Sequence, residues 1–231
     1  MPTTAALFLP GMMCDERLFA PQVEALDVAA THADTRHADS VADMARQVLA
    51  AAPPRFACIG LSMGGILAFE IWRQAPDRVT HLALLDTNPR AEKDERQAER
   101  FAEIEFALHG GLRELAIERM KPKYLAASKR DDQALLDLVL DMAMELGPEV
   151  FRRQSMLLKD RPDSVATLAT IDCPTLVLCG AEDQLCPVEY HEQMAREIPG
   201  ARLSVVEDCG HLSTLEQPAA VSEEINRLIK R

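Results

Sequence analysis

Ser62 stands at the centre of the segment Gly60-Leu61-Ser62-Met63-Gly64, between an apolar run and a stretch with helical periodicity. The pattern G-x-S-x-G between a strand and a helix is typical of a sharp turn that exposes a serine hydroxyl as a nucleophile. Glycines flank the serine because side chains at those positions would collide in so tight and strained a turn. The N-terminus of the following helix would favour a developing negative charge beside the hydroxyl. The segment therefore predicts a nucleophilic serine.

A serine hydroxyl needs a base within hydrogen-bonding distance, and the base needs a third group that orients it. His211 and Asp183 each stand in a short loop directly after an apolar, strand-like run. Loops that follow parallel strands meet at one edge of the sheet, so we expect both side chains near Ser62, with His211 as general base and Asp183 as the orienting acid. Asp86 also follows a strand-like run and Glu182 is adjacent to Asp183, so either carboxylate remains an alternative partner for the histidine.

The elements that must position these residues are short apolar runs, each followed by polar residues and a helix-like segment. The runs cover residues 5–9, 55–59, 81–85, 175–179 and 203–206, with a weaker one near 28–31. Their continuous hydrophobicity predicts strands that are buried on both faces. We therefore expect an α/β fold with a mostly parallel sheet of about six strands and helices on both faces.

Residues 89–173 lack strand signals and are instead helix-like and heavily charged. Amphipathic helices are expected at 92–109, 112–120, 132–146 and 148–158. Because a single crossover needs far fewer residues, we expect a helical cap inserted after the fourth strand. The predicted organisation is a core of residues 1–88 and 174–231 with a cap of residues 89–173; peripheral helices without a lid role are the alternative.

The composition of the chain limits which kinds of partner the protein can bind. A formal net charge of −12 argues against nucleic acid, whose binding needs a basic face. No apolar run approaches the roughly 20 residues of a membrane span, and the first residues lack the basic and apolar regions of a signal peptide. We expect a cytoplasmic protein with no membrane partner.

The spacing of the six cysteines favours free thiols over disulfides or a metal site, so we expect no metal. The cysteines are Cys14, Cys58, Cys173, Cys179, Cys186 and Cys209.

Taken together, these segments resemble the α/β-hydrolase fold, close to small bacterial carboxylesterases within a broader group that includes C–C bond hydrolases and pimeloyl-ester hydrolases. The resemblance rests on the segment 9–12 (Leu-Pro-Gly-Met), the turn at Ser62, the loop 180–187 with Asp183, and Gly210-His211. It implies an oxyanion hole formed by the backbone N–H groups of Met12 and Met63.

Two departures from that family pattern affect the expected fold. Pro10-Gly11 replaces the His-Gly of many relatives, which keeps the backbone donor and changes the packing of the loop. The strand before this loop begins almost at Met1, so the first two strands of the family are missing and about six strands, all parallel, are expected in place of the usual ~8.

The expected function is a serine hydrolase that cleaves a small carboxylic ester or lactone through an acyl-enzyme on Ser62, without a cofactor. A serine at this turn excludes the dehalogenase and epoxide hydrolase branches, which use aspartate. Thioesterase, C–C bond hydrolase, aminopeptidase and acyltransferase activities fit the same triad, and a non-catalytic ligand-binding receptor and a pure interaction scaffold are alternatives of another class. The natural substrate and the oligomeric state are left open.

An adaptable apolar pocket for a small acyl group is suggested by the methionines and by an aromatic content of only 4%. Methionine at helical spacing is also typical of an ordinary core. The candidate pocket residues are Met13, Phe106, Met142, Met144 and Met156.

Overall fold

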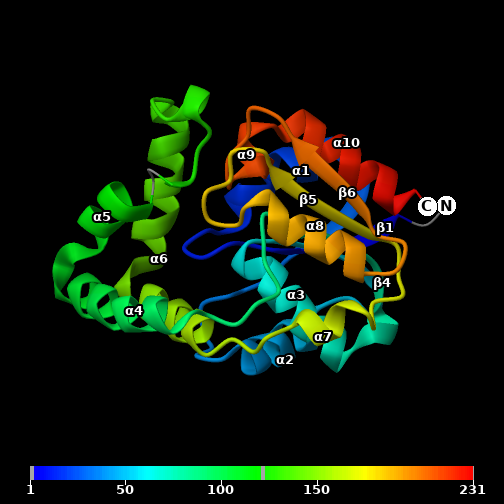
Figure 1. Cartoon of the computed structure of the whole chain (residues 1–231), viewed down its shortest axis with the longest axis horizontal. Coiled ribbons are helices and arrows are strands. Elements are labelled where there is room, and N and C mark those ends of the chain that lie inside the picture. The colour runs from blue at the N-terminus through cyan, green and yellow to red at the C-terminus, as the bar shows by residue number, and fades with distance from the viewer. Residues whose placement is uncertain (1–2, 121–122, 231) are drawn as a thin grey trace.

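A parallel sheet forms the centre of the protein, whose computed structural model describes residues 3–120 and 123–230 (Figure 1). Six strands follow the order β2-β1-β3-β4-β5-β6, and all five neighbouring pairs are parallel. The prediction of about six parallel strands is confirmed. The strands are β1 (Thr4–Leu9), β2 (Val28–His32), β3 (Phe56–Leu61), β4 (Val79–Leu85), β5 (Thr175–Gly180) and β6 (Arg202–Val206).

Side chains of the central strands alternate between two apolar clusters, one on each face of the sheet. Leu7 and Leu9 of β1 belong to the cluster that also holds residues of α2 (Val41–Ala51), α3 (Met63–Gln74) and α8 (Val188–Glu197). Ala6 and Phe8 belong to the opposite cluster, which is covered by α1 (Ala20–Ala25) and α10 (Pro218–Ile229). Burial on both faces explains why these strands read as continuous apolar runs.

Polar caps and prolines set the helix boundaries. The Ser40 hydroxyl accepts a 3.1 Å hydrogen bond from the N–H of Asp43 and so caps the start of α2. Pro187 precedes α8, and Pro218 is the first residue of α10. Sequence reasoning missed the short helices at 16–25 and α9 (Ser213–Glu216), since each is too short to show a clear period.

The segment between β4 and β5 is helical. It contains α4 (Asp94–Phe106), η3 (Ala107–Gly111), α5 (Leu112–Leu115), η4 (Ala116–Met120), η6 (Ala127–Lys129), α6 (Gln133–Lys159) and α7 (Val165–Leu168). In Figure 1, α4, α5 and α6 stand together on one side of the sheet layer. They share a small core of their own that includes Ile104, Leu140 and Phe151.

Gly147 interrupts α6 with φ 80 and ψ 174, directly before Pro148. The two predicted helices, 132–146 and 148–158, therefore follow each other across this break. Within residues 3–120 and 123–230, no helix combines the length and the apolar character that crossing a membrane would require.

The end of this segment belongs to the main core. Helix α7 packs against α8, and Leu168 and Ile171 lie in the same apolar cluster as α3. Leu157 and Leu158, near the end of α6, lie there too. The helices that stand apart from the sheet thus form a shorter unit than the whole of residues 89–173.

Candidate active site

Ser62 occupies the turn between β3, which ends at Leu61, and α3, which begins at Met63. Its φ of 56 lies in the left-handed region, a strained conformation for a residue with a side chain. A Cβ added to Gly60 would lie 2.4 Å from the backbone oxygen of Gly64, and one added to Gly64 would lie 1.9 Å from that of Leu9. Only glycine fits at these two positions.

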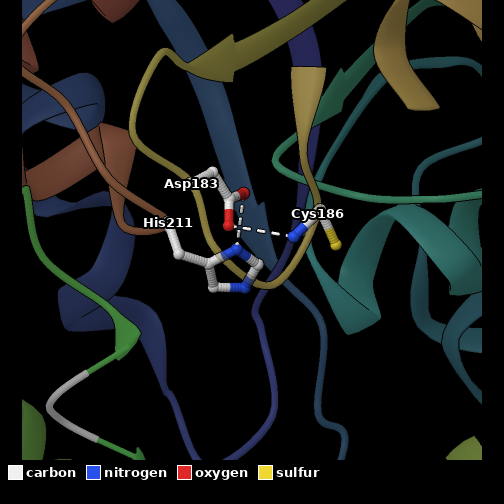
Figure 2. Close-up of side chains that lie close together, drawn as sticks. All are labelled: Asp183, Cys186 and His211. Atoms are coloured by element: carbon white, nitrogen blue, oxygen red, sulfur yellow. Dashed lines mark hydrogen bonds and ion pairs between the residues drawn. The ribbon is translucent and has the colours of Figure 1, made fainter. Parts of the chain in front are cut away.

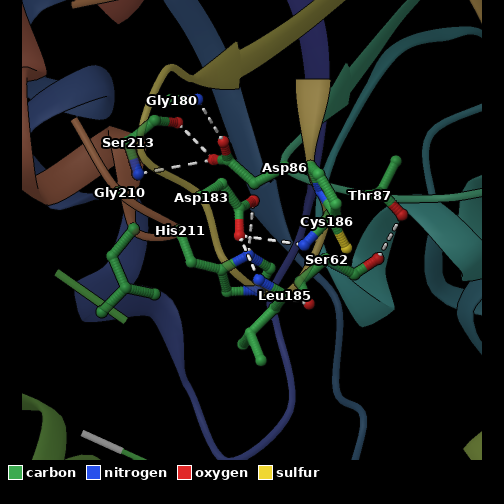
Figure 3. A network of polar contacts seen from close by, with 12 residues as sticks. Ser62, Asp86, Thr87, Gly180, Asp183, Leu185, Cys186, Gly210, His211 and Ser213 are labelled. Atoms are coloured by element: carbon green, nitrogen blue, oxygen red, sulfur yellow. Dashed lines mark hydrogen bonds and ion pairs between the residues drawn. The ribbon is translucent and has the colours of Figure 1, made fainter. Parts of the chain in front are cut away.

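Ser62, His211 and Asp183 form a continuous hydrogen-bonded chain (Figure 3). The Ser62 Oγ lies 2.9 Å from Nε2 of His211, and Nδ1 of the same ring lies 2.8 Å from Oδ2 of Asp183. With the proton on Nδ1, the ring donates to the carboxylate and accepts from the serine hydroxyl. The structure therefore brings together the three side chains that the sequence singled out.

Asp183 is held by the loop that follows β5 (Figure 2). Its Oδ1 accepts hydrogen bonds from the backbone N–H groups of Leu185 at 2.8 Å and Cys186 at 2.9 Å. The second oxygen is left for His211, and the Asp183 side chain has no exposed surface. Two fixed donors on one oxygen orient the carboxylate toward the imidazole.

The two alternative carboxylates have other partners. Oδ1 of Asp86 accepts from the N–H of Gly180 at 3.0 Å, and its Oδ2 accepts from the Ser213 hydroxyl at 2.5 Å. Burial, reinforced by the nearby Asp183, raises the pKa of Asp86 well above its usual value and favours its neutral form. Glu182 accepts a 2.8 Å hydrogen bond from the N–H of Ala127. The histidine partner is therefore Asp183.

Two opposing effects act on the imidazole of His211. Burial disfavours its charged form, but the Asp183 carboxylate, by its charge and its hydrogen bond, more than compensates, so the pKa of His211 is raised above its usual 6.5. A raised pKa makes the imidazole a stronger proton acceptor. It also stabilises the imidazolium that forms when the serine gives up its proton.

Sequence reasoning missed the residues that hold the histidine loop. The N–H of His211 donates a 2.7 Å hydrogen bond to the carbonyl oxygen of Tyr124, whose ring stacks on the imidazole at 5.9 Å between centroids. The Glu216 carboxylate accepts hydrogen bonds from two backbone N–H groups of this loop and from that of Ala126. The segment before α6 is thereby tied to the catalytic loop. No periodicity or motif marks Tyr124.

The N–H groups of Met12 and Met63 remain free to bind an oxyanion. Neither donates a hydrogen bond to a residue within the described ranges, whereas the N–H of the next residue, Met13, donates to Oε1 of Gln154 at 2.8 Å. Met63 is the first residue of α3, where backbone N–H groups have no partner inside the helix. These observations support the oxyanion role.

A cavity of about 680 Å³ lies over the serine, lined by Gly11, Met12, Ser62, Tyr124 and His211 among others. Charged side chains of the segment between β4 and β5 form much of the remaining wall. They include Glu92, Arg96, Arg100, Glu103 and Arg161. This lining differs from the apolar pocket that the methionine content suggested.

The predicted pocket residues lie elsewhere, which corrects that part of the sequence analysis. Met13 and Met142 are buried in apolar clusters, and Met156 is packed against the cluster that holds Met13. Phe106 and Met144 are 41% and 39% exposed, and the Phe106 ring lies over Gly111. None of the five is among the described residues that line the cavity. Composition cannot separate the wall of a pocket from core or surface.

One group of potential metal ligands occurs in the described ranges, and it overlaps the triad: Asp183, Cys186 and His211 (Figure 2). Both oxygens of Asp183 and both nitrogens of His211 already take part in hydrogen bonds. Burial, followed by the charge of Asp183, raises the pKa of the Cys186 thiol, which disfavours the thiolate that metals bind. These donors fit a hydrogen-bonded triad and not a metal centre.

A serine after β3, an acid after β5 and a histidine after β6, joined by hydrogen bonds, have the arrangement of a serine hydrolase on a parallel α/β sheet. The family model described as the alpha/beta hydrolase family matches residues 7–224, and the chain belongs to this family. The predicted fold class and family resemblance are thereby confirmed.

Several known proteins are similar to this chain. A pimeloyl-[acyl-carrier protein] methyl ester esterase of Chromobacterium violaceum is 28% identical over 178 residues, which cover 75% of this chain and 68% of the relative. A solved thermophilic esterase from Thermogutta terrifontis is 28% identical, with a TM-score of 0.90 over 99% of this chain and 91% of its own. The enol-lactonase from Burkholderia xenovorans, at 21% identity, shares the fold with a TM-score of 0.89 over 100% and 93% of the two chains.

Proposed function

We propose that this protein hydrolyses carboxylic esters through an acyl-enzyme on Ser62, with His211 as general base and Asp183 as the acid that orients it. The observation that carries the proposal is the hydrogen-bonded chain of 2.9 Å and 2.8 Å through His211, which ends at a serine on the cavity wall. Relatives that are esterases, at 28% identity, support the ester as the bond cleaved.

In the first half-reaction, Ser62 Oγ attacks the ester carbonyl while Nε2 of His211 takes its proton. The oxyanion of the tetrahedral intermediate accepts hydrogen bonds from the N–H groups of Met12 and Met63. The intermediate collapses and expels the alcohol, which takes the proton from His211. An acyl group then remains on the serine.

Water completes the cycle. His211 takes a proton from the water as it attacks the acyl carbonyl, and then returns a proton to Ser62 as the serine leaves. One ester and one water become one carboxylic acid and one alcohol. The Asp183 carboxylate stabilises the imidazolium after each proton transfer.

We further propose that the helices between β4 and β5 act as the cap that selects the substrate. Their side chains supply much of the cavity wall, and Tyr124 stacks on the catalytic imidazole. A thioester, a C–C bond, an amide or an acyl acceptor other than water would use the same triad, so these remain alternatives within this class. A cytoplasmic location also stays a proposal, supported by six free cysteines.

The test needs no knowledge of the natural substrate. Wild type and the Ser62→Ala variant are incubated with a fluorophosphonate, their intact masses are measured, and hydrolysis of 4-nitrophenyl butyrate is followed in parallel. We expect a single adduct and turnover for wild type, and neither for the variant. Ser204→Ala, which changes a partly buried serine on β6 away from the cavity, is the matched control and should behave as wild type.

A non-catalytic receptor would show neither adduct formation nor ester turnover in the wild type. A folded wild-type protein that takes no adduct and hydrolyses no ester would reject the triad as a working site. An adduct that persists in Ser62→Ala would place the nucleophile elsewhere. Adduct formation without ester turnover would retain the nucleophile and reject the ester as the bond cleaved.

A further inference from the structure

Two arginines on the cavity wall share one carboxylate. Arg100 of α4 contacts Oε2 of Glu92 at 2.6 Å through both Nε and Nη2, and Arg161 contacts the two oxygens of Glu92 at 3.1 Å. All three side chains are nearly buried, at 8%, 8% and 9% exposure. Two positive charges and one negative charge leave one positive charge in excess, in a place where water screens it poorly.

The hydrogen-bond donors of the two arginines are used differently. Besides Glu92, each Arg161 nitrogen other than Nη2 has a carbonyl acceptor: Nε donates to the oxygen of Arg90 and Nη1 to that of Leu158. The Nη1 of Arg100 meets only the thioether sulfur of Met12, at 4.0 Å, within the described parts of the chain. A thioether is a weak acceptor, and a buried charged donor without a proper partner is costly. Nη1 of Arg100 is therefore available to a ligand.

Arg100 belongs to the wall of the cavity that contains the reaction centre. Arg100 and Met12 line the same cavity as Ser62 and His211. Since the backbone N–H of Met12 is the proposed oxyanion donor, its side chain places Nη1 of Arg100 next to the loop that would hold the ester carbonyl. An ester bound at Ser62 can thus present a second polar group to Arg100.

The other negative charges of the cavity wall are either paired with an arginine or exposed to water. Arg96 is bound to Glu103 by two contacts of 2.8 Å, which pairs one positive charge with one negative charge. Glu99 contacts Arg96 at 2.9 Å and adds a second negative charge, but its side chain is 65% exposed, so water screens that charge. Glu118 and Lys123, one group of each sign, are exposed at the cavity. The buried positive charge of the cavity wall is therefore located around Arg100.

We propose that Arg100 binds a carboxylate carried by the substrate, so that the preferred substrates are acidic esters such as monoesters of dicarboxylic acids. The inference rests on the proposed ester hydrolysis at Ser62 and adds the substrate class. A guanidinium and a carboxylate form short, charge-assisted hydrogen bonds, stronger than those of a neutral amide. Arg100 is thus a specificity-determining residue.

The test compares an acidic ester with its neutral isostere. Hydrolysis of monomethyl adipate and of methyl adipamate, which replaces the carboxylate by an amide, is followed by the alcohol released. Monoesters from succinate to suberate, each with its amide counterpart, determine which chain length reaches Nη1. We expect wild-type kcat/KM to favour the best acidic ester by at least about tenfold, the range of one charge-assisted hydrogen bond.

Arg100→Gln should lower kcat/KM for the acidic ester by about tenfold to a hundredfold and change that of the amide ester by less than about threefold. Arg100→Lys keeps the charge and should retain part of the preference. Arg113→Gln replaces an exposed arginine of α5 outside the cavity lining and changes the net charge by the same amount. This variant should retain the full preference for the acidic ester.

A measurement on wild type covers the case in which Arg100→Gln does not fold. Adipate should slow labelling of Ser62 by a fluorophosphonate at a concentration where adipamide does not. Equal protection by the two, or an amide ester hydrolysed as fast as the acidic ester at every chain length, would overturn the role of Arg100 while the esterase stands. Failure of Ser62 to react at all would overturn the proposed function itself.

Discussion

The backbone N–H of Met13 donates a hydrogen bond of 2.8 Å to the side-chain oxygen of Gln154, a residue of α6 that is 141 positions away in the sequence. Gln154 is fully buried, and its amide nitrogen donates to the carbonyl and hydroxyl oxygens of Thr35 at 3.2 Å. Met13 has a φ of 55, a strained value next to the proposed oxyanion donor Met12. A helix from the segment between β4 and β5 thus fixes the oxyanion loop.

Gln154→Met should damage catalysis more than substrate binding. The variant keeps the length of the side chain and removes the acceptor, so the buried N–H of Met13 loses its partner and the loop relaxes. We expect kcat to fall about tenfold with little change in KM, because a misplaced oxyanion donor weakens binding of the transition state. The free energy of unfolding should fall by about 1–3 kcal/mol.

Thr35→Val is the matched control, because it removes one partner of Gln154 and leaves the contact with Met13 in place. Steady-state kinetics and urea unfolding on both variants give the comparison. A normal kcat for Gln154→Met would show that the oxyanion loop keeps its geometry without this contact.

Asp183→Asn should nearly abolish turnover while the fold persists. An amide in this position no longer enforces the tautomer that leaves Nε2 of His211 free to accept the serine proton, and it cannot stabilise the imidazolium. We expect kcat to fall by roughly 10³–10⁴-fold. The control is Asp86→Asn, since Asp86 is buried nearby, bonds Gly180 and Ser213, and already favours its neutral form. An equal loss in both variants would contradict the assignment of Asp183.

The pH profile should report the raised pKa of His211. The imidazole must be neutral to take the proton of Ser62, so kcat/KM on a neutral ester should fall as the pH drops through this pKa. The acid limb should therefore lie above 6.5, the usual value for histidine. In Asp183→Asn the acid limb of the residual activity should lie at a lower pH than in wild type. Burial lowers the pKa of His211, and no carboxylate is left to compensate. A wild-type limb below 6.5 would contradict the electrostatic balance described above.

The strands and the triad could be predicted because local signals determine them. Strands buried on both faces appear as continuous apolar runs, and the turn at Ser62 requires glycines at fixed positions. His211 and Asp183 follow from their places after strands. The edge strand β2 gave the weakest signal, because Ala29 and Ala30 are exposed.

The cavity could not be predicted because it depends on how distant helices pack over the sheet. A charged residue on an amphipathic helix is normally assigned to the solvent face, yet Arg100 and Glu103 of α4 are each only 7% exposed. Their burial results from pairing across the segment, such as Arg100 with Glu92. Tyr124 likewise reaches His211 only through tertiary packing.

Glu216→Gln should loosen the loop that carries His211. The carboxylate accepts hydrogen bonds from the N–H groups of Ala126, Gly210 and Leu212, and the amide of glutamine would turn its own N–H groups toward at least one of these donors. We expect the free energy of unfolding to fall by about 1–3 kcal/mol, with a Tm lower by about 2–4 °C per kcal/mol for a chain of this size.

Glu223→Gln is the matched control for this change, because Glu223 is an exposed partner of Arg227 in α10 and should alter stability by less than about 0.5 kcal/mol. Thermal melts followed by circular dichroism give the Tm values, and the rate of Ser62 phosphonylation reports the position of His211. Because Ala126 belongs to the segment before α6, Glu216→Gln should slow phosphonylation as well as lower the Tm. A lower Tm with an unchanged rate would restrict Glu216 to stability and leave the orientation of His211 to Tyr124 and Asp183.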